Sequence, residues 1–422
     1  MLEQLEFHHV GPAPSLIFDF APRLNILTGD NGLGKTFILD VAWWALTRTW
    51  VSHPAAPHRG QDLNPTLSFQ FRGKKTPIRY SSTYDFQEQL WPSKPGRPAN
   101  PGLVLYARVD GSFSVWDPAR NYWKKAPSLG VDSPDRPPAY HFNPRQVWDG
   151  LQPDGKILCN GLIRDWASWQ GRQGEPFRQL LQALQALSSS HNEPLLPGEL
   201  TRISLEDVRD MPTLQTPYGE QVPVVHASAG VKRIISLAYL LVWTWQEHIQ
   251  AARLLNQDVT RQIIFLIDEI EAHLHPRWQR TILRSLLNVM AALTGSEDVE
   301  VQVIAVTHSP LLLASLEPLF DVQKDALWHL DLHERAVTLN RATWRRRGDA
   351  NSWLISDVFE LSEPRALEAE QAIHHAEALM RRKNVQPEEF EQVRTDLRAS
   401  LPDVDPFWLR WRFWASEQGL GK

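Results

Sequence analysis

The apolar and polar positions of this chain follow two patterns, one typical of strands and the other of helices. Near the amino end, residues 2–7 alternate as a half-buried strand would, and residues 15–20 form a second segment that can pair with it. Residues 24–27 form a short apolar strand that ends in a glycine-rich turn, and helical spacing follows from residue 35 to about residue 49. This order predicts a strand, a turn and a helix in direct succession.

Residues 67–125 differ, because their apolar segments are short and turn residues separate them. Such spacing is typical of an antiparallel β meander. The proline-rich stretch 91–101 interrupts the meander and indicates an exposed loop. The expected strands are residues 67–71, 77–81, 103–109 and 113–116.

From residue 228 onward, long helical segments alternate with short apolar ones, which predicts a parallel sheet flanked by helices. We expect helices over 228–255 and 276–294, and strands over 262–267 and 299–306. The remaining part predicts an antiparallel strand pair and then two helices. Their ranges are 326–332 and 336–341 for the strands, and 364–383 and 387–400 for the helices.

Composition narrows the classes of protein that fit. The 422 residues carry a net charge of −5, from 44 basic and 49 acidic side chains, which excludes a generally basic nucleic-acid coat. The only cysteine, Cys159, cannot form an intrachain disulfide or a thiolate zinc cage, and this suits a reducing compartment. No secretory signal is evident, and no apolar run is long enough to cross a bilayer. We expect a cytoplasmic protein without membrane contact.

The 18 Trp and 31 Pro residues gather outside the segments with regular patterns. Together with the strand and helix patterns, they predict four regions. These are an N-terminal lobe with the glycine-rich turn and the meander (1–130), an irregular and helical insert rich in Pro and Trp (131–225), a C-terminal lobe (226–345) and a helical tail (346–422).

The turn after residue 27 carries the first chemical signal, since residues 29–36 fit the P-loop pattern G-x-x-x-x-G-K-[ST]. Glycines let successive backbone N–H groups converge on phosphate oxygens at the start of a helix. Lys35 would neutralise phosphate charge, and the Thr36 hydroxyl would bind Mg²⁺. The alternative is a glycine-rich turn with a surface lysine. The expected ATP-binding residues are Asn31, Gly32, Leu33, Gly34, Lys35 and Thr36.

Two later strands end in polar residues that can complete such a site. The apolar strand 263–267 delivers Asp268 and Glu269 at its carboxyl end, where ligands bind in parallel sheets. Asp268 would hold Mg²⁺, and Glu269 would orient or deprotonate a water molecule. His308 follows the next strand, 40 residues after Asp268, and could touch the γ-phosphate or that water. A solvated acidic pair and a helix-capping His are the alternatives.

These residues resemble the ABC-type ATPase head shared by SMC, RecF-like and OLD-like proteins. The resemblance rests on Asn31-Gly32 before Gly-Lys-Thr, on DEIEAHLHP at 268–276 as Walker B and D-loop, and on THSP at 307–310 as His-switch. It implies an α/β P-loop NTPase fold, with a mixed parallel sheet plus an antiparallel meander, over residues 1–340. It also places Glu271, His273 and His275 in a D-loop that contacts a second chain, in preference to a metal site.

The resemblance further implies a signature loop at the start of the helix before Walker B. ASAGVKR at 227–233 stands there and departs from the common LSGGQ, but it retains Ser228 and Gly230 on either side of Ala229. Without the resemblance, this segment would be an ordinary serine helix cap. The sequence does not identify the Q-loop glutamine that the resemblance also implies. Gln146 is the candidate, with Gln87 and Gln89 as alternatives.

Several features of related families are missing from the sequence. Long heptads and membrane spans are absent, and the expected strand 326–332 ends in Asp331-Leu332-His333, which lacks the second acid of the Asp-x-Asp of a Toprim nuclease. The chain therefore looks most similar to the stand-alone ATPases of bacterial anti-phage operons, such as PtuA-like ATPases paired with an HNH endonuclease. The resemblance implies ATP and Mg²⁺, a head-to-tail homodimer or a higher even-numbered oligomer, and a separate effector of the HNH nuclease type. The alternatives are a RecF-like DNA-maintenance ATPase that binds DNA directly, and an idle ATP-sensing scaffold.

The aromatic end DPFWLRWRFW at 405–414 permits two interpretations. Trp408, Trp411 and Trp414 either pack onto the ATPase core of the same chain or contribute to a docking surface for the effector. The basic runs 345–347 and 381–383 are the densest positive segments, and direct contact of the chain with nucleic acid stays open. The Trp-bearing stretch 147–170 is expected to pack the insert against the core, with base stacking as the alternative.

Overall fold

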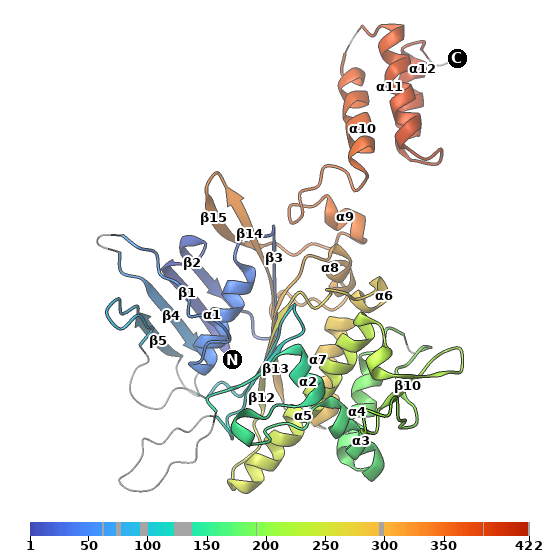
Figure 1. The fold of residues 1–422 in the computed structure, drawn as a ribbon. Coiled ribbons are helices and arrows are strands. Elements are labelled where there is room, and N and C mark those ends of the chain that lie inside the picture. Colours follow the sequence, from blue (N-terminus) through green and yellow to red (C-terminus); the bar gives the residue numbers. More distant parts are fainter. Residues whose placement is uncertain are drawn as a thin grey trace. The chain divides into compact units, whose positions relative to one another are not determined.

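The structure is a computed structural model that describes residues 1–60, 63–72, 77–92, 100–121, 137–190, 192–294, 299–382 and 384–420. Most of the expected loop 91–101 and Lys383 of the second basic run lie outside the described residues. The chain forms two compact units, Met1–Gly348 and Asp349–Lys422 (Figure 1). The regional boundaries at residues 130 and 225 stay predictions.

An eight-stranded mixed sheet organises the first unit. Its order is β15 (Ala336–Ala342), β14 (Asp325–His333), β3 (Leu24–Gly29), β13 (Glu300–Val306), β12 (Gln262–Asp268), β6 (Leu103–Ala107), β7 (Phe113–Trp116) and β8 (Tyr140–Phe142). The five strands from β14 to β6 are mutually parallel, while β15, β7 and β8 pair antiparallel at the two edges. The carboxyl ends of β3, β13, β12 and β6 therefore share one edge, which is the edge that binds ligands in such sheets.

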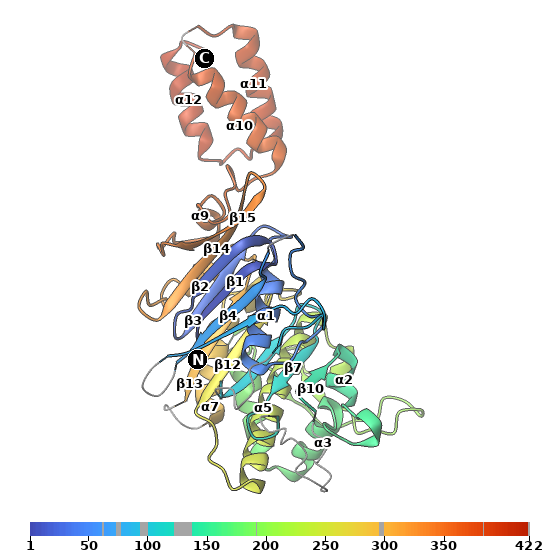
Figure 2. The ribbon, with the colours of Figure 1, turned by 90° about the vertical axis from the view of Figure 1, so that its left-hand side faces the viewer.

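A second, four-stranded antiparallel sheet packs against one face of the first. Its order is β2 (Ala13–Asp19), β1 (Leu2–Val10), β4 (Thr66–Phe71) and β5 (Ile78–Thr83). Helix α1 (Lys35–Thr47) lies between the two sheets in Figure 1, and Figure 2 views the four-stranded sheet from its outer side. The core there is rich in aromatic side chains, with Phe7, Phe18 and Trp43 fully buried. The fold class expected from the sequence is confirmed, although the predicted meander is divided, since β4 and β5 belong to this sheet and β6 and β7 to the larger one.

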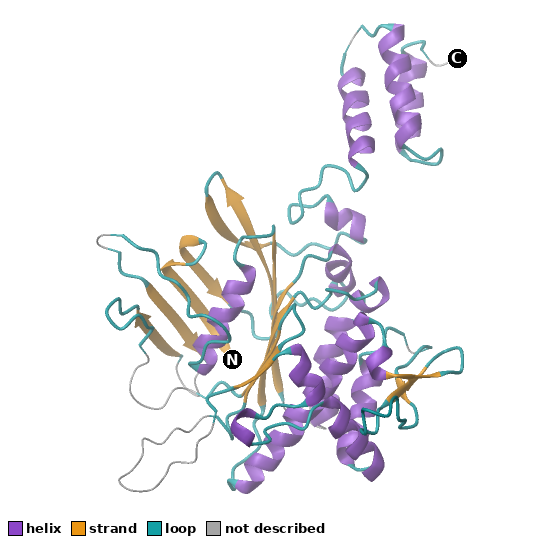
Figure 3. Cartoon of the chain, in the orientation of Figure 1, coloured by secondary structure: helices purple, strands orange, loops and turns teal. Residues whose placement is uncertain are grey.

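Helices cover the other face of the large sheet (Figure 3). The main ones are α5 (Ala229–Leu254), α7 (Ile282–Thr294) and α4 (Glu175–Ala186), which pack together. The helix expected over 276–294 is two helices, because the chain turns at Arg280 and Thr281, and the Thr281 hydroxyl donates to the Trp278 carbonyl. Shorter elements complete the unit. They are α2 (Pro144–Asp149), α3 (Leu162–Arg172), α6 (Pro276–Gln279), α8 (Pro310–Leu316), the 3-10 helices Pro153–Gly155 and Val224–His226, and the small sheet of β9 (Leu196–Pro197), β10 (Thr213–Gln215) and β11 (Gln221–Pro223).

The insert contributes part of this helical layer. Trp166 in α3 is fully buried, and its indole N–H donates to Gln170 at 3.0 Å. The ring of Trp169 packs on Tyr239 of α5, with 5.6 Å between the ring centroids. These contacts support packing of the insert against the core. No described helix is long and apolar enough to span a bilayer.

The second unit is helical and has a core of its own. Helices α10 (Leu367–Met380), α11 (Pro387–Ser400) and α12 (Phe407–Glu417) pack around it, and α9 (Ala350–Leu354) precedes them. Trp408, Trp411 and Trp414 are at most 8% exposed in this core. These rings pack on the unit's other helices, so they do not themselves present the docking surface that one of the two interpretations requires. Leu409 and Phe413 are the exposed apolar residues of α12.

Candidate active site

The glycine-rich turn joins β3 to α1 through backbone conformations that favour glycine. Gly29 has φ 136° and Gly34 has φ 88°, both in the left-handed half of the map. A Cβ atom on Gly29 would lie 2.1 Å from the Leu330 carbonyl oxygen of β14, so this position has no room for a side chain. Asn31 and Gly32 are exposed, whereas Leu33 is buried in the core that anchors the turn. The loop is thus fixed at its base and open at its tip.

Lys35, the first residue of α1, folds back into this loop. Its ammonium group donates to the carbonyl oxygens of Gly29 at 2.8 Å and Asp30 at 2.6 Å. Burial lowers the pKa of Lys35, while the charges of Glu269, Asp30 and Asp268 act in the opposite direction. The cation therefore lies at the sheet edge where phosphate groups would approach.

Thr36 and Asp268, which are 232 residues apart in the sequence, are in direct contact. The Thr36 hydroxyl donates to Asp268 Oδ2 at 2.9 Å. The other carboxylate oxygen, Oδ1, is buried and has no hydrogen-bond partner in the described part of the chain. Burial raises the pKa of Asp268 to about 6, since the Thr36 hydrogen bond only partly offsets it. A hydroxyl beside a buried, unsatisfied carboxylate oxygen fits Mg²⁺, which prefers hard oxygen ligands.

Glu269 and His308 face each other at the ends of neighbouring strands. Glu269 Oε1 lies 3.6 Å from His308 Nε2, and both side chains remain about one-third exposed. Burial, followed by the nearby Lys35 charge, lowers the pKa of His308, so its ring is neutral near pH 7. The backbone of Glu269 has φ 46°, a conformation that is costly for a residue with a side chain. The Glu269 amide donates to the Val306 carbonyl at 3.1 Å, which ties the strained residue to β13.

Three residues of this site were not assigned to it from the sequence. Glu271 accepts hydrogen bonds from the Thr307 hydroxyl at 2.7 Å and the His308 amide at 2.6 Å, and so it clamps the ends of β12 and β13 together. The Tyr106 hydroxyl donates to Asp40 of α1 at 3.0 Å. Asp40 is four residues after Thr36, which places both on one face of α1. In the sequence, only this helical spacing from Thr36 connects Asp40 with the site.

Arg108 is a further residue that the sequence did not reveal. It follows β6, which pairs in parallel with β12. Burial raises the pKa values of Asp40 and Asp268, and the charge of Arg108 opposes part of that rise. Until the pairing of β6 with β12 is known, nothing in the sequence singles it out. The strand beside Walker B is thus followed by a cation.

None of the three glutamines lies at a strand end beside Asp268. Gln146 completes the capping box of α2, since its side-chain oxygen accepts from the amide of the cap residue Asn143 at 2.9 Å. It follows edge strand β8, which β6 and β7 separate from β12, a distance of roughly 14 Å at the usual strand spacing. Gln87 and Gln89 lie exposed in the turn after β5. The structure therefore does not bring the Q-loop candidates to the site.

The signature segment occupies the start of α5. Ser228 is the helix cap, and its hydroxyl accepts from the Val231 amide at 3.4 Å. Ser228 and Ala229 are exposed, whereas Gly230 is buried. A Cβ on Gly230 would lie 2.8 Å from the His273 carbonyl oxygen, so the start of α5 packs closely on the loop after β12. The described side-chain groups include no cluster of His, Cys, Asp and Glu that could hold a metal.

Three solved structures show a limited likeness to this fold. They are "SMC head domain from Thermotoga maritima" (TM-score 0.40, 11% identity), "Crystal structure of the SmcHead bound to the C-winged helix domain of ScpA" (0.41, 13%) and the Smc head domain with an extended coiled coil bound to the C-terminal domain of ScpA from Pyrococcus furiosus (0.38, 11%). Each likeness covers 81% or 82% of this chain and at least 96% of the other.

Three relatives match by sequence. "Retron Ec83 probable ATPase" of Escherichia coli is 21% identical, over 83% of this chain and 74% of its own length. "Retron Vc95 probable ATPase" of Vibrio cholerae is 28% identical over 28% of this chain and 22% of its own. "Septu protein PtuA" of Bacillus mycoides is 47% identical over 39% of this chain and 22% of its own.

A family match spans the site itself. The family described as "AAA domain, putative AbiEii toxin, Type IV TA system" matches residues 24–314. This range begins at β3 and ends in α8, so it includes Lys35, Asp268 and His308. It also covers more than half of the chain, and the resemblance to an AAA/ABC-type ATPase head is confirmed at the level of the family. The chain belongs to this family of AAA domains.

Proposed function

We propose that the chain is a Mg²⁺-dependent ATPase that controls a separate effector in a bacterial anti-phage complex. The observation that carries the ATPase proposal is the hydrogen bond between Thr36 and Asp268. It joins the P-loop to the carboxyl end of β12 and places a buried carboxylate beside the helix start where phosphate would bind. The family match supports the same chemistry.

In this proposal, each residue has a separate task. Lys35 exchanges its two loop carbonyls for phosphate oxygens, and the backbone amides of residues 31–36 surround the same phosphates. Thr36 and Asp268 hold Mg²⁺, which neutralises phosphate charge when it is bound. Glu269 orients the attacking water and accepts its proton. The neutral His308 ring, whose Nε2 lies 3.6 Å from Glu269 Oε1, makes a hydrogen bond to that water.

The signature segment requires a second copy of the chain. Ser228 lies exposed at the amino end of α5, so its hydroxyl is accessible to a nucleotide held by another protomer. Two chains arranged head to tail would then share two ATP sites, which is a closed two-fold assembly. The proposed state is a homodimer or a higher even-numbered oligomer.

The defence role and the effector rest on resemblance. Relatives whose names assign them to Septu and to retrons match this chain. The resemblance to the ATPases of anti-phage operons implies a partner of the HNH nuclease type in the cytoplasm. We place effector contact on the exposed side of α12, because Leu409 is 76% and Phe413 68% exposed there. Apolar side chains with this exposure are candidates for an interface core.

Two variants test the ATPase proposal. Lys35→Ala should abolish ATP binding, because the cation contacts phosphates in the ground state. Glu269→Gln should keep binding and reduce turnover by about 10²-fold or more, because the carboxylate acts on the water. Binding is measured with a fluorescent ATP analogue, and turnover by phosphate release with and without EDTA. The catalytic role of Glu269 is refuted if Glu269→Gln turns over ATP at the parental rate, and the ATPase proposal is refuted if the parent releases no more phosphate without EDTA than with it.

A further inference from the structure

Arg233 makes a set of backbone contacts that the catalytic scheme does not use. It lies in the second turn of α5, five residues after Ser228. Its guanidinium donates to the carbonyl oxygens of Val109 at 2.7 Å and Glu269 at 3.0 Å. Longer contacts reach the carbonyls of Arg108 at 3.5 Å and Asp268 at 3.4 Å. One side chain thus joins the signature helix, the end of β12 and the turn after β6.

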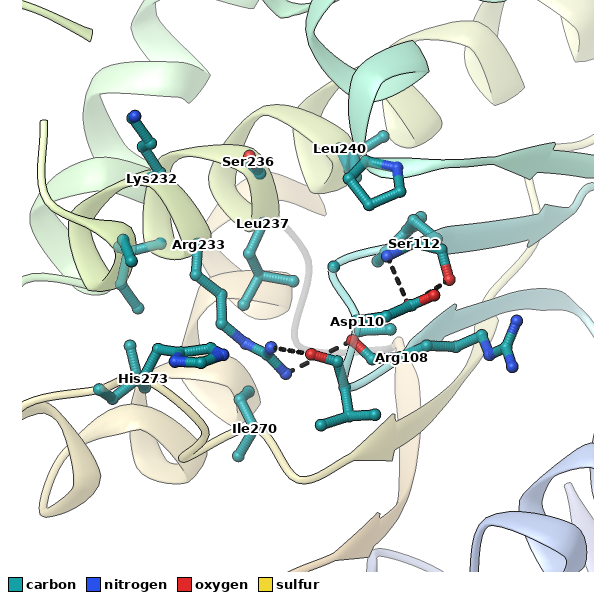
Figure 4. A pocket seen from close by; sticks show the side chains of 18 of the residues that line it. Arg108, Asp110, Ser112, Lys232, Arg233, Ser236, Leu237, Leu240, Ile270 and His273 are labelled. Carbon is teal, nitrogen blue, oxygen red and sulfur yellow. Dashed lines mark hydrogen bonds between the residues drawn. The ribbon is translucent and has the colours of Figure 1, made fainter. Parts of the chain in front are cut away.

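The surroundings of Arg233 show why this link is distinctive. The side chain crosses one wall of a cavity of about 290 Å³ between α5 and the β6–β7 turn, and Figure 4 shows it reaching the turn while Arg108 points away. The rest of the wall is largely apolar, with contributions from Leu237, Leu240, Ile270 and Phe113. The cavity leaves the beginning of α5 incompletely packed against the turn, so the guanidinium bridges a gap that side-chain packing does not close.

The contact with Glu269 acts on a strained residue. A non-glycine residue at φ 46° persists only when its surroundings determine its conformation. Here the amide of Glu269 donates to Val306, and its carbonyl accepts from both Arg233 at 3.0 Å and the Ala272 amide at 2.9 Å. Loss of the Arg233 bond would leave this carbonyl with the Ala272 bond, and the weaker restraint on the strained residue would let its carboxylate shift relative to His308.

The charge of Arg233 is balanced by groups around it. Burial lowers its pKa, and the carboxylates of Glu271, Asp268, Glu269 and Asp110 oppose this effect. An arginine remains protonated in such a place, and its planar fork can donate to several carbonyls at once. A lysine would keep the charge, but its single ammonium group cannot span the same carbonyls.

We propose that Arg233 is a positioning residue that couples the signature end of α5 to the backbone of Glu269. When a nucleotide contacts Ser228 and shifts the beginning of α5, Arg233 carries that shift to the carboxylate that activates water. Hydrolysis at the site that contains this Glu269 then depends on whether Ser228 of the same chain contacts the nucleotide held by the other chain. The inference rests on the proposed ATPase function, and it adds a route by which that function is regulated.

The test compares Arg233→Lys and Arg233→Met with Arg253→Met, which removes a positive charge at the exposed far end of the same helix. Both Arg233 variants should lose about 10- to 100-fold in kcat, as expected when a reacting group is misplaced by about 1 Å. Their affinity for the fluorescent ATP analogue should stay within about threefold of the parent, since Lys35 and Thr36 are untouched. Arg253→Met should match the parent in both measurements.

Hydrogen exchange gives a readout that does not need turnover. In Arg233→Lys, amides in the segment 268–275 should exchange faster, while those in the middle of α5 keep their protection. A parental kcat in both variants overturns the proposal. Parallel loss of nucleotide binding, turnover and protection throughout α5 also overturns it, because that outcome indicates a merely structural role.

A double-mutant cycle with Glu269→Gln tests whether Arg233 acts through Glu269. If Arg233 acts through Glu269, Arg233→Lys should add no further loss to the single-turnover rate of Glu269→Gln, whereas multiplied losses refute the coupling. Failure of the ATPase proposal is distinguishable from failure of this one. If the parent does not hydrolyse ATP, unchanged exchange in 268–275 still overturns the Arg233 link, and faster exchange supports it.

Discussion

Replacement of Asp268 by Asn should stabilise the protein without metal while it removes the Mg²⁺ site. The Asp268 side chain is buried, with the whole residue 1% exposed, and Oδ1 lacks a hydrogen-bond partner within the described residues. Its charged form is therefore poorly solvated in the folded state. An amide of the same shape carries no charge, so it avoids this penalty and can still accept a hydrogen bond from Thr36.

The magnitude follows from the pKa shift. Burial raises the pKa of Asp268 from 3.8 to about 6, and about 1.4 kcal/mol per pKa unit gives a penalty of about 3 kcal/mol. Because the folded-state pKa is raised, the folded protein holds its proton longer than the unfolded chain does. The penalty is absent below the unfolded value, grows as the pH rises from about 4 to 6, and is fully present above the folded pKa.

The assay is urea unfolding of the parent and Asp268→Asn in EDTA between pH 4.5 and 8, followed by a probe in the first unit. Asp258→Asn, which changes an exposed carboxyl in the loop before β12, is the matched control. The stability difference between Asp268→Asn and the parent should increase up to about pH 6 and then level off. Addition of Mg²⁺ with a nucleotide should stabilise only the parent and Asp258→Asn. A pH-independent difference would refute the reasoning.

Other substitutions test the remaining features. Gly29→Ala should destabilise the fold by more than about 3 kcal/mol in urea unfolding, because its Cβ would meet a carbonyl oxygen at 2.1 Å, whereas Gly32→Ala, with no atom within 4 Å, should cost only about 1–2 kcal/mol. Ser228→Arg should bind ATP but not hydrolyse it. Mixing Ser228→Arg with Lys35→Ala should restore part of the activity if sites are shared between chains, and no recovery despite mixed assembly would count against sharing. Leu409→Glu with Phe413→Glu should keep ATPase activity but lose a co-purifying effector, and full retention of the effector would contradict docking on α12.

The parts of the site that local sequence determines were predictable. The segment 29–36 specifies its own turn through glycines, and an apolar strand that ends in Asp268 and Glu269 needs only the rule for parallel sheets. The loop and the two strand ends accordingly lie together in the structure. Pairing between distant strands was not predictable. The sequence cannot show that β6 lies beside β12, about 160 residues later, so it does not predict that Arg108 lies near Asp268.

The aromatic tail shows a similar limit. Trp408 and Trp411 have helical spacing, which indicates one apolar face but not the surface that covers it. The rings of Phe390 and Trp411 stack with centroids 5.2 Å apart, so helix α11 provides the cover. The break between α6 and α7 was also missed, since the apolar pattern continues across it and only the hydrogen bond of Thr281 reveals it.

The position of β3 between β13 and β14 has a consequence for synthesis of the protein. Both neighbours of the P-loop strand lie near the end of the first unit, and Gly29 is shaped to fit against Leu330. At ~5–20 residues per second, roughly 300 further residues take ~15–60 s to translate. A growing chain therefore carries an incomplete nucleotide site for most of its time on the ribosome. Fragments that end before β14 should not bind ATP. The nascent chain should therefore gain nucleotide binding only when synthesis of its first unit is nearly finished.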